Sequence, residues 1–430
     1  MRHSITLFSL WCVFSLACFW PLPVNARVYI DITSAQTRKV PVAVPYLEEE
    51  ARPGVLHEPG KQMADLLGRA LDFHGFIGIV PPEKYGGGMQ ADWAAVGADF
   101  VVKGQYSRTA SGMEVDLKLI EVQGGRMILG RRYRGTWEKR RFMLLKFCDE
   151  VILELSGEQG VSLSQIAFSA DTTGHKEIYL ADVLGDEIRQ VTSHGSIAVA
   201  PRFSPDAALL AYTSYHRGSP ALYITDLSQN RTTKPLSRRK GLNMAPGWSP
   251  DGKTLAITLS VDGNPDLFLM DTNGQILARL TKDAGINVSP SWSPDGKSIC
   301  FVSDRTGNPQ VYIMDVSSRM VRRLTYQGNY NSSPNWSPKG DLITYSGHDE
   351  GSNHIFTIDV DGKQIKRLTD SWGDYESPCW APDGRQIVLS RKRKDAVQIC
   401  AIFYNGTGLR PLFKLSGRQN FPQWSPRLRK

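Results

Sequence analysis

The sequence predicts a small α/β domain followed by an all-β, six-bladed β-propeller that is closed by its C-terminal strand. The main observation is a recurring phrase, which reads Pro-x-Trp-Ser-Pro-Asp-Gly in its fullest form at residues 290–296. Its aromatic positions follow one another at steps of 45, 44, 44, 44 and 44 residues, at Phe203, Trp248, Trp292, Trp336, Trp380 and Trp424. A period of about 40–45 residues built from short strands is typical of propeller blades.

Residues 1–26 have the pattern of a signal peptide. Ile5–Trp20 is an apolar run, and Val24 and Ala26 place small residues where signal peptidase requires them. The run is short for a membrane anchor. A lipoprotein would use Cys18, but Ser15 stands where an aliphatic residue is expected. We therefore expect an exported chain that begins at residue 27.

Residues 27–160 are predicted to form the α/β domain. Strand-like and helix-like patterns alternate there, and Gly124-Gly125 suits a hairpin between two of the strands. The expected strands are Val28–Ile32, Val40–Val44, Phe100–Tyr106, Glu114–Val122 and Met127–Arg134, and the expected helices are Lys61–Phe73 and Glu138–Leu155. Residues 157–160 are the expected linker.

Each repeat in residues 161–430 is predicted to supply four short strands. In the repeat at 286–325 these are Ile286–Pro290, Ser298–Ser303, Gln310–Asp315 and Val321–Thr325. Ser-Pro-Asp-Gly at 293–296 makes the first turn, because proline suits its second position and glycine accepts a positive φ. The tryptophans are expected to pack between neighbouring blades.

The ends of the repeat region predict how the ring closes. Residues 163–192 contain a second, third and fourth strand but no first strand, whereas 420–426 contain only a first strand. The C-terminal segment should therefore complete the N-terminal blade, which makes six blades and leaves no open sheet edge between the two ends.

Composition excludes some functional classes. Hydrophobic residues make up 41% and charged residues 22%, which are ordinary globular values, and the formal charge is +8. Nucleic acid is an unexpected partner for an exported chain. Basic runs such as 391–394 suit either an anionic envelope surface or an acidic partner, or are solvated loops. Cys148, Cys300, Cys379 and Cys400 are expected to remain free thiols.

No catalytic constellation is recognisable. The chain lacks a Gly-x-Ser-x-Gly elbow, a phosphate-binding loop and a His-Glu-x-x-His metal site. His57 and His74 are expected to be structural. Near the propeller axis the only carboxylates belong to Asp374 and Glu376 of one blade, whereas a Ca²⁺ site needs about six to eight oxygens. We therefore predict no enzyme activity, no cofactor and no metal.

The residues that lead into the first strands are expected at one mouth of the central tunnel. Five positions before each aromatic stand Ala198, Asn243, Asn287, Asn331, Tyr375 and Gln419. The three asparagines could bind a cation, hydrogen-bond a partner's backbone or line a wet channel. A rim of amides, apolar groups and one acid suits a protein loop. We predict a protein-binding arc formed by Leu242, Asn243, Met244, Asn287, Val288, Tyr330, Asn331, Tyr375 and Glu376.

The signal peptide, the small α/β domain and the Pro-x-Trp-Ser-Pro-Asp-Gly repeats together resemble the TolB family of periplasmic propeller proteins. The resemblance covers nearly all of residues 27–430, and its specific part is the segment 27–32 followed by 40–46 and a helix. Departures such as Phe203, Lys339-Gly340 and Pro426-Arg427 fall in the repeated phrase and its turns.

The resemblance implies a non-enzymatic docking protein of the Tol–Pal system. In that family the mature N-terminal segment binds TolA, an inner-membrane protein, which implies a TolA contact at Arg27, Val28, Tyr29, Ile30, Asp31 and Ile32. One propeller mouth binds Pal, a lipoprotein attached to the outer membrane and peptidoglycan, which implies that the predicted arc binds Pal. The system keeps the outer membrane intact and drives its constriction at cell division.

Two other functions are weighed against this one. An exported propeller enzyme, or the accessory domain of a hydrolase, would need acids or histidines that converge on the axis. A carbohydrate or peptidoglycan binder would use exposed aromatic residues, for which Tyr326, Tyr330, Trp372 and Tyr375 are the candidates.

Overall fold

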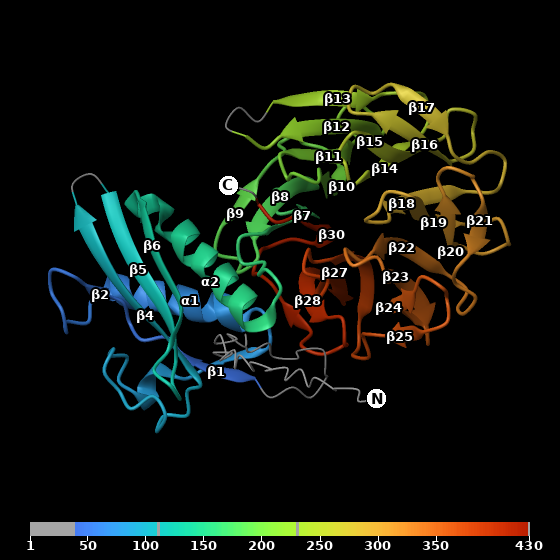
Figure 1. Cartoon of the computed structure of the whole chain (residues 1–430). Helices are drawn as coiled ribbons and strands as arrows, with labels where there is room; N and C mark the ends of the chain where they lie inside the picture. The colour runs from blue at the N-terminus through green and yellow to red at the C-terminus, as the bar shows by residue number, and fades with distance from the viewer. Residues whose placement is uncertain (1–38, 110–111, 229–231, 429–430) are drawn as a thin grey trace, which may run out of the picture.

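The computed structural model describes residues 39–109, 112–228 and 232–428. The predicted signal peptide, the predicted strand Val28–Ile32 and the predicted TolA contact lie outside the described residues. Figure 1 shows an α/β domain, coloured blue to teal, beside a ring of sheets coloured green to red. The predicted fold class, an α/β domain and a six-bladed propeller, is confirmed.

The α/β domain is one mixed sheet whose core is shared with two helices. The sheet order is β3-β1-β4-β5-β6, with β2 paired to β4; the pairs among β1 to β4 are parallel, and β4, β5 and β6 are antiparallel. The strands are β1 (Val40–Ala43), β2 (Glu48–Glu49), β3 (Ile77–Ile79), β4 (Phe100–Thr109), β5 (Gly112–Glu121) and β6 (Met127–Gly135). The helices are α1 (Glu58–Asp72) and α2 (Arg140–Ser156), with 3₁₀ turns at Pro82–Lys84 and Trp137–Lys139.

The sequence explains where these helices form and where α2 ends. In α1, Met63, Leu67 and Leu71 recur at helical spacing and are at most 2% exposed. In α2, Gly157 caps the C-terminal end with φ +73°, a left-handed conformation that glycine adopts without steric cost. The short strands β2 and β3 were not predicted, because two or three residues carry no detectable period.

The propeller consists of six four-stranded antiparallel sheets, and the strands of each are named below in order from the axis outward. The first three are β10 (Ala198–Phe203), β11 (Leu209–Ser214), β12 (Ala221–Asp226), β13 (Thr233–Ser237); β14 (Asn243–Trp248), β15 (Thr254–Leu259), β16 (Asp266–Asp271), β17 (Ile276–Arg279); and β18 (Asn287–Trp292), β19 (Ser298–Ser303), β20 (Gln310–Asp315), β21 (Val321–Arg323). The others are β22 (Asn331–Trp336), β23 (Leu342–Asp349), β24 (Ser352–Asp359), β25 (Ile365–Arg367); β26 (Asp374–Trp380), β27 (Gln386–Arg393), β28 (Ala396–Phe403), β29 (Arg410–Pro411); and β30 (Gln419–Trp424), β7 (Gln165–Ala170), β8 (Glu177–Asp182), β9 (Ile188–Gln190).

The inner strands run further than the sequence indicates. The predicted strand ended at Pro290, but β18 continues to Trp292. A β-bulge makes this possible: the pairing shifts between Val288 and Ser291, and Ser289 has φ +56°. Since the bulged residues are outside the hydrogen-bond ladder, the missing N–H of proline breaks no ladder bond.

The Ser-Pro-Asp-Gly turns hold the inner two strands together. In the turn at 293–296, Ser293 Oγ donates to Asp295 Oδ1 at 2.5 Å, and the Ser298 N–H donates back to Ser293 Oγ at 2.9 Å. Gly296 takes φ +73°. The same Ser–Asp bond recurs at 2.6 Å between Ser249 and Asp251. The phrase recurs because each of its residues meets a local requirement of this turn.

The C-terminal strand closes the ring as predicted. β30 pairs with β7, from Gln419 opposite Ala170 to Trp424 opposite Ile166. Trp424 is 2% exposed, and its indole N–H donates to Ser164 Oγ at 2.7 Å. The first and the last strands of the propeller therefore share one blade.

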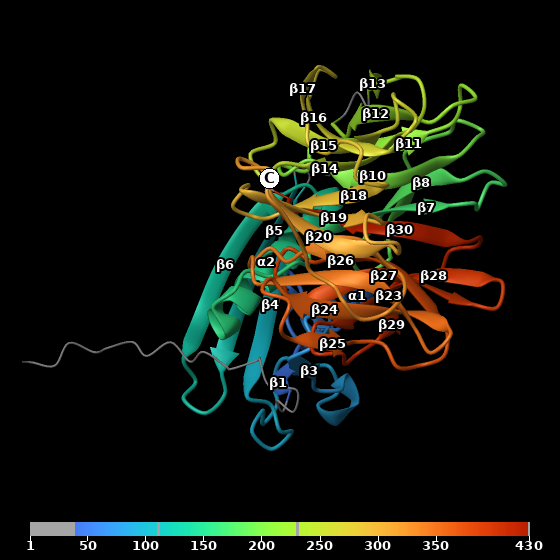
Figure 2. The same ribbon diagram turned by 90° about the vertical axis from the view of Figure 1, so that its right-hand side faces the viewer.

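The α/β domain lies against the last blades of the ring, as Figures 1 and 2 show from two sides. Arg69 donates both terminal nitrogens to Asp186 at 2.8 Å, and Arg141 reaches the same carboxylate at 2.8 Å. Glu158, in the linker, pairs with Lys339 and Arg385 at 3.0 Å. Several separate contacts thus join the two parts.

Candidate docking surfaces of the propeller

The two mouths of the tunnel have different surroundings. Each inner strand ends at a Trp-Ser-Pro-type turn, and the prolines of three such turns line a groove together with α2 (Pro205, Pro382, Pro426, Phe142 and Leu153). The other mouth, where the inner strands begin, therefore faces away from α2. We call it the strand-start mouth. All nine residues of the predicted arc lie at or next to the starts of β14, β18, β22 and β26.

The three asparagines of the arc are buried beneath the strand-start mouth. Asn243 and Asn287 are fully buried, and Asn331 is 2% exposed. Each uses its carboxamide to tie the incoming loop to the sheet. Asn243 Oδ1 accepts from Ser237 Oγ at 2.6 Å, and its Nδ2 donates to the Arg239 carbonyl at 2.7 Å. These amides therefore set the shape of the rim from below.

The other two asparagines are bonded in the same way. Asn287 Nδ2 donates to Gly285 O at 2.8 Å, and its Oδ1 accepts from Arg305 at 2.8 Å. Asn331 Nδ2 donates to Gln310 Oε1 and to Gln327 O, both at 2.8 Å. The Nδ2 groups of all three asparagines, and the Oδ1 atoms of Asn243 and Asn287, are therefore engaged within the protein.

Tyr375 and Glu376 are neighbours in β26, but one side chain is buried and the other is exposed. Tyr375 is fully buried, and its hydroxyl lies 2.5 Å from Ser371 Oγ. Its ring stacks on His354, with 6.0 Å between the ring centroids. Glu376 is exposed, and its carboxylate accepts from Asn353 Nδ2 at 2.9 Å. Of this pair, only Glu376 presents its side chain to solvent.

Apolar side chains form the exposed part of the strand-start mouth. Leu242, Met244 and Val288 are half-buried, and Tyr330 is 49% exposed. Two residues that the sequence analysis missed stand in the register of Leu242 and Tyr330, six positions before the aromatic: Ile197, 46% exposed, and Ile286, 45% exposed. We call Ile197, Leu242, Ile286 and Tyr330 the apolar crescent. Comparing the residue six positions before each repeat aromatic would have identified both isoleucines from the sequence.

The remaining two blades carry charge at this register, at Asp374 and Arg418. Arg418 pairs with Asp171 at 2.9 Å. It lines a groove of about 540 Å³ whose lysines come from two blades (Lys176, Lys392 and Lys394). Part of the basic run at 391–394 thus lines a groove beside the strand-start mouth. The rim therefore has an apolar sector on four blades and a charged sector on the other two.

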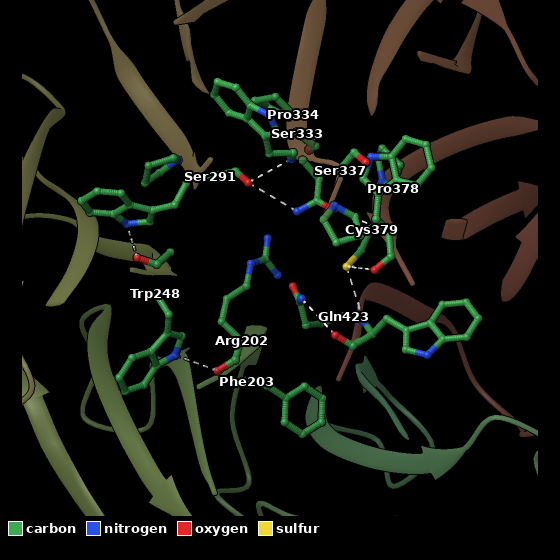
Figure 3. A pocket seen from close by; sticks show the side chains of 18 of the residues that line it. Arg202, Phe203, Trp248, Ser291, Ser333, Pro334, Ser337, Pro378, Cys379 and Gln423 are labelled. Carbon is green, nitrogen blue, oxygen red and sulfur yellow. Dashed lines mark hydrogen bonds between the residues drawn. The ribbon is translucent and has the colours of Figure 1, made fainter. Parts of the chain in front are cut away.

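The tunnel between the mouths contains a cavity of about 430 Å³. All six inner strands line it, with serines, prolines and the repeat aromatics. Figure 3 shows Arg202, which follows a bulge in β10, extending toward the middle of this cavity, with Ser291, Cys379 and Gln423 around it. Trp248 donates its indole N–H to the Arg202 carbonyl at 3.2 Å, which links neighbouring blades.

Across the ranges that the structure describes, no three His, Cys, Asp or Glu side chains are grouped so that they could hold a metal ion. None of the described helices is long and apolar enough to cross a membrane. Cys148, Cys300, Cys379 and Cys400 are free, buried thiols, as predicted.

Comparison with protein families finds two matches along the chain. The model described as the TolB beta propeller domain matches residues 153–428, and the TolB amino-terminal domain matches residues 28–128. The Tol-Pal system protein TolB of Desulfotalea psychrophila is 44% identical over 218 residues, which cover 51% of this chain and 50% of that protein. The Tol-Pal system protein TolB of Desulfosudis oleivorans is 38% identical over 227 residues. By these alignments, the chain spans about half the length of the curated relatives it matches.

A solved structure resembles this one over most of its length. The crystal structure of TolB from Acinetobacter baumannii has a TM-score of 0.80 and 27% identity, and the match covers 90% of this chain and 97% of that one. The likeness therefore extends over both the α/β domain and the propeller.

Proposed function

Because the chain belongs to the TolB family, we propose that it is a non-enzymatic docking protein of the Tol–Pal system in the periplasm. It is exported by a signal peptide at residues 1–26 and binds a Pal-like lipoprotein and a TolA-like inner-membrane protein. By linking the two, it maintains the outer membrane and contributes to its constriction at division.

The observation that best supports a docking role is the apolar crescent. It places large apolar side chains at one register of four consecutive blades, and three of them, Ile197, Ile286 and Tyr330, are exposed. Large side chains in such a cluster, next to a polar and charged rim, are typical of protein interfaces. We assign Pal binding to the predicted arc together with Ile197 and Ile286, the asparagines acting as supports of the rim.

The test is to place charge in the apolar crescent. The double variant Ile286→Arg/Tyr330→Arg is expected to bind the soluble domain of a Pal-like lipoprotein at least tenfold more weakly, a change of about 1.4 kcal/mol, as measured by calorimetry. Both side chains are about half exposed, so the fold should be retained.

The matched control is Leu277→Arg/Met320→Arg, which changes two apolar residues that are at least as exposed and lie in the outer part of neighbouring blades. It is expected to bind normally. Equal binding by the test and the control variants would move the Pal site away from the strand-start mouth.

The TolA contact is proposed for Arg27–Ile32, which could add a strand to an exposed sheet edge of the partner. Deleting residues 27–38 is expected to abolish binding to a TolA-like protein in a pull-down while leaving the melting temperature unchanged. Among the described residues, the sheet of the α/β domain is built from strands between residues 40 and 135. Undiminished binding by the truncated chain would contradict the assignment.

The hydrolase alternative gains no support from the tunnel. Among the described residues that line the cavity, Arg202 is the only charged one, and none is a histidine, aspartate or glutamate. General acid–base chemistry needs such groups within hydrogen-bond reach of a substrate.

A further inference from the structure

The tunnel contains one positive charge in otherwise neutral surroundings. The described residues that line the 430 Å³ cavity comprise hydroxyl, amide, thiol and apolar side chains, with Arg202 the single charged residue. The guanidinium extends from β10 toward the middle of the cavity, as Figure 3 shows. The six inner strands surround the cavity and separate the guanidinium from the outer surface of the propeller.

The guanidinium has little compensation from the protein. Within the described ranges its only hydrogen bond is from one terminal nitrogen to the Pro201 carbonyl at 2.9 Å, which leaves most of its five N–H donors for other partners. Burial lowers the pKa of Arg202 from its usual value, although an arginine remains protonated near neutral pH. A desolvated cation without a counter-charge is unfavourable.

The nearby thiol does not supply that counter-charge. Burial raises the pKa of Cys379 to about 11, so the thiol is neutral at pH 7. Cys379 Sγ accepts the Trp424 N–H at 3.4 Å and is within sulfur hydrogen-bond distance of the Trp380 carbonyl, at 3.5 Å. The cavity therefore lacks a negative group among the described residues and has room for one.

We propose that the tunnel is a binding site for a carboxylate group, which pairs with the guanidinium of Arg202. The charge favours a monoanion, because a second negative charge would meet only neutral walls. The planar fork of arginine matches a carboxylate with two parallel hydrogen bonds. The volume lies within the range of about 300–1,000 Å³ found for small-ligand pockets, and Phe203 and Trp248 offer apolar walls for the remainder of the ligand. The carboxylate belongs either to a small organic acid or to an acidic side chain of a docked protein.

The experiment titrates the mature chain with sodium acetate, with the ionic strength held constant by sodium fluoride. Trp248 and Trp292 line the cavity, so their fluorescence is expected to report saturable binding. Arg202→Met, which keeps the bulk but removes the charge, is expected to bind acetate at least tenfold more weakly. The affinity of Arg202→Lys for acetate should lie between those of the unchanged chain and Arg202→Met, because lysine keeps the positive charge but lacks the planar guanidinium that forms two parallel hydrogen bonds.

The matched control is Arg322→Met, which changes an exposed arginine in β21 and is expected to bind acetate like the unchanged chain. Absence of saturation in the unchanged chain, equal affinity in Arg202→Met, or chloride binding as tightly as acetate would each overturn the proposal.

A second arm identifies the source of the carboxylate, and this arm alone rests on the proposed function. The titration is repeated with a saturating amount of the soluble domain of a Pal-like lipoprotein. Loss of the acetate response shows that a carboxylate of the docked protein occupies the tunnel. A retained response assigns the site to a small acid.

Discussion

His74 is a buried imidazole at the junction between the α/β domain and the linker to the propeller. Its Nε2 accepts the Val161 N–H at 3.0 Å, and its Nδ1 lies 2.9 Å from the Ala70 carbonyl. These partners require the neutral ring with the proton on Nδ1. Burial is the main cause that lowers the pKa of His74 from 6.5 to about 4. The structural role expected from the sequence agrees with this geometry.

This histidine should make the protein sensitive to acid. Between pH 6.5 and 4 the unfolded chain binds a proton that folded His74 does not, so the stability it contributes is lost as the pH falls. His74→Gln removes this loss. Between pH 7 and pH 4.5 the unchanged chain should therefore lose about 2 kcal/mol more of its free energy of unfolding than the variant does, as measured by urea denaturation.

Asp149 provides a paired variant of opposite sign. Its Oδ1 accepts the Ser162 N–H at 2.7 Å, yet burial raises its pKa from 3.8 to about 6. The folded state therefore binds more protons between these values, and the contribution of Asp149 grows as the pH falls. Asp149→Asn should lose stability relative to the unchanged chain over the same range. Parallel pH curves for all three proteins would contradict both assignments.

Single residues also show where prediction from sequence stops. Asn243, Asn287 and Asn331 were placed correctly at the start of the inner strands, but nothing in the repeat distinguishes an amide that faces a partner from one that ties down a loop. That distinction depends on the neighbours Ser237, Arg305 and Gln310, which lie in other strands and loops. Ile286 carried a signal in its spacing, whereas the isolation of Arg202 could be seen only once six strands surrounded it.

Among the elements, the outer strands explain why a threonine follows the hydrophobic residue at Leu324-Thr325 and again at Leu368-Thr369. Thr325 Oγ1 accepts the Val311 N–H at 2.9 Å, and Thr369 does the same for Ile355 at 3.0 Å. The hydroxyl continues the pairing beyond the end of the fourth strand. The predicted strand Val321–Thr325 included the first of these threonines, whereas β21 ends at Arg323. At this position a bond to the threonine hydroxyl takes the place of the backbone hydrogen bond that a continuing strand would supply.

The tryptophans of the inner strands were expected to be packing residues, and Trp424 allows a direct test. Trp424→Ala should destabilise the propeller by about 3–5 kcal/mol, because it empties a buried site between the last strand and its neighbours. Trp372→Ala is the control: this side chain is 65% exposed, and its loss should change stability by less than about 0.5 kcal/mol. Thermal unfolding followed by circular dichroism measures both. Similar melting temperatures for the two variants would show that closure does not depend on this contact.

At the scale of the whole molecule, one glycine marks how closely the two parts approach. Gly75 has φ +84°, and a Cβ placed there would lie 2.1 Å from the ring of Phe403 in β28. Phe403 is further held by Arg410, which lies 5.1 Å from its ring centre. The sequence could predict two domains and a linker, but not this contact, because the residues on the two surfaces follow no shared period.

Gly75→Ala should therefore loosen the junction. It is expected to lower stability by about 1–2 kcal/mol more than Gly174→Ala, and to speed proteolytic cleavage of the linker at 157–160. Gly174 is the matched control, since it has φ +88° but no atom within 4 Å of the added methyl group. Both variants carry the same backbone penalty, so the difference isolates the contact with Phe403. Equal stability and equal cleavage rates would show that the two parts adjust without cost.

The shared blade has a consequence for how the protein is made. Ser164 and Trp424 are hydrogen-bonded across 260 residues, so the blade that begins with β7 is completed only after the other five blades have been synthesised. A chain that lacks β30 leaves the inner edge of β7 unpaired. Such chains open more readily and are degraded faster by proteases. Folding of this blade is thus coupled to completion of the other five, and sensitivity to proteases reports whether β30 is in place.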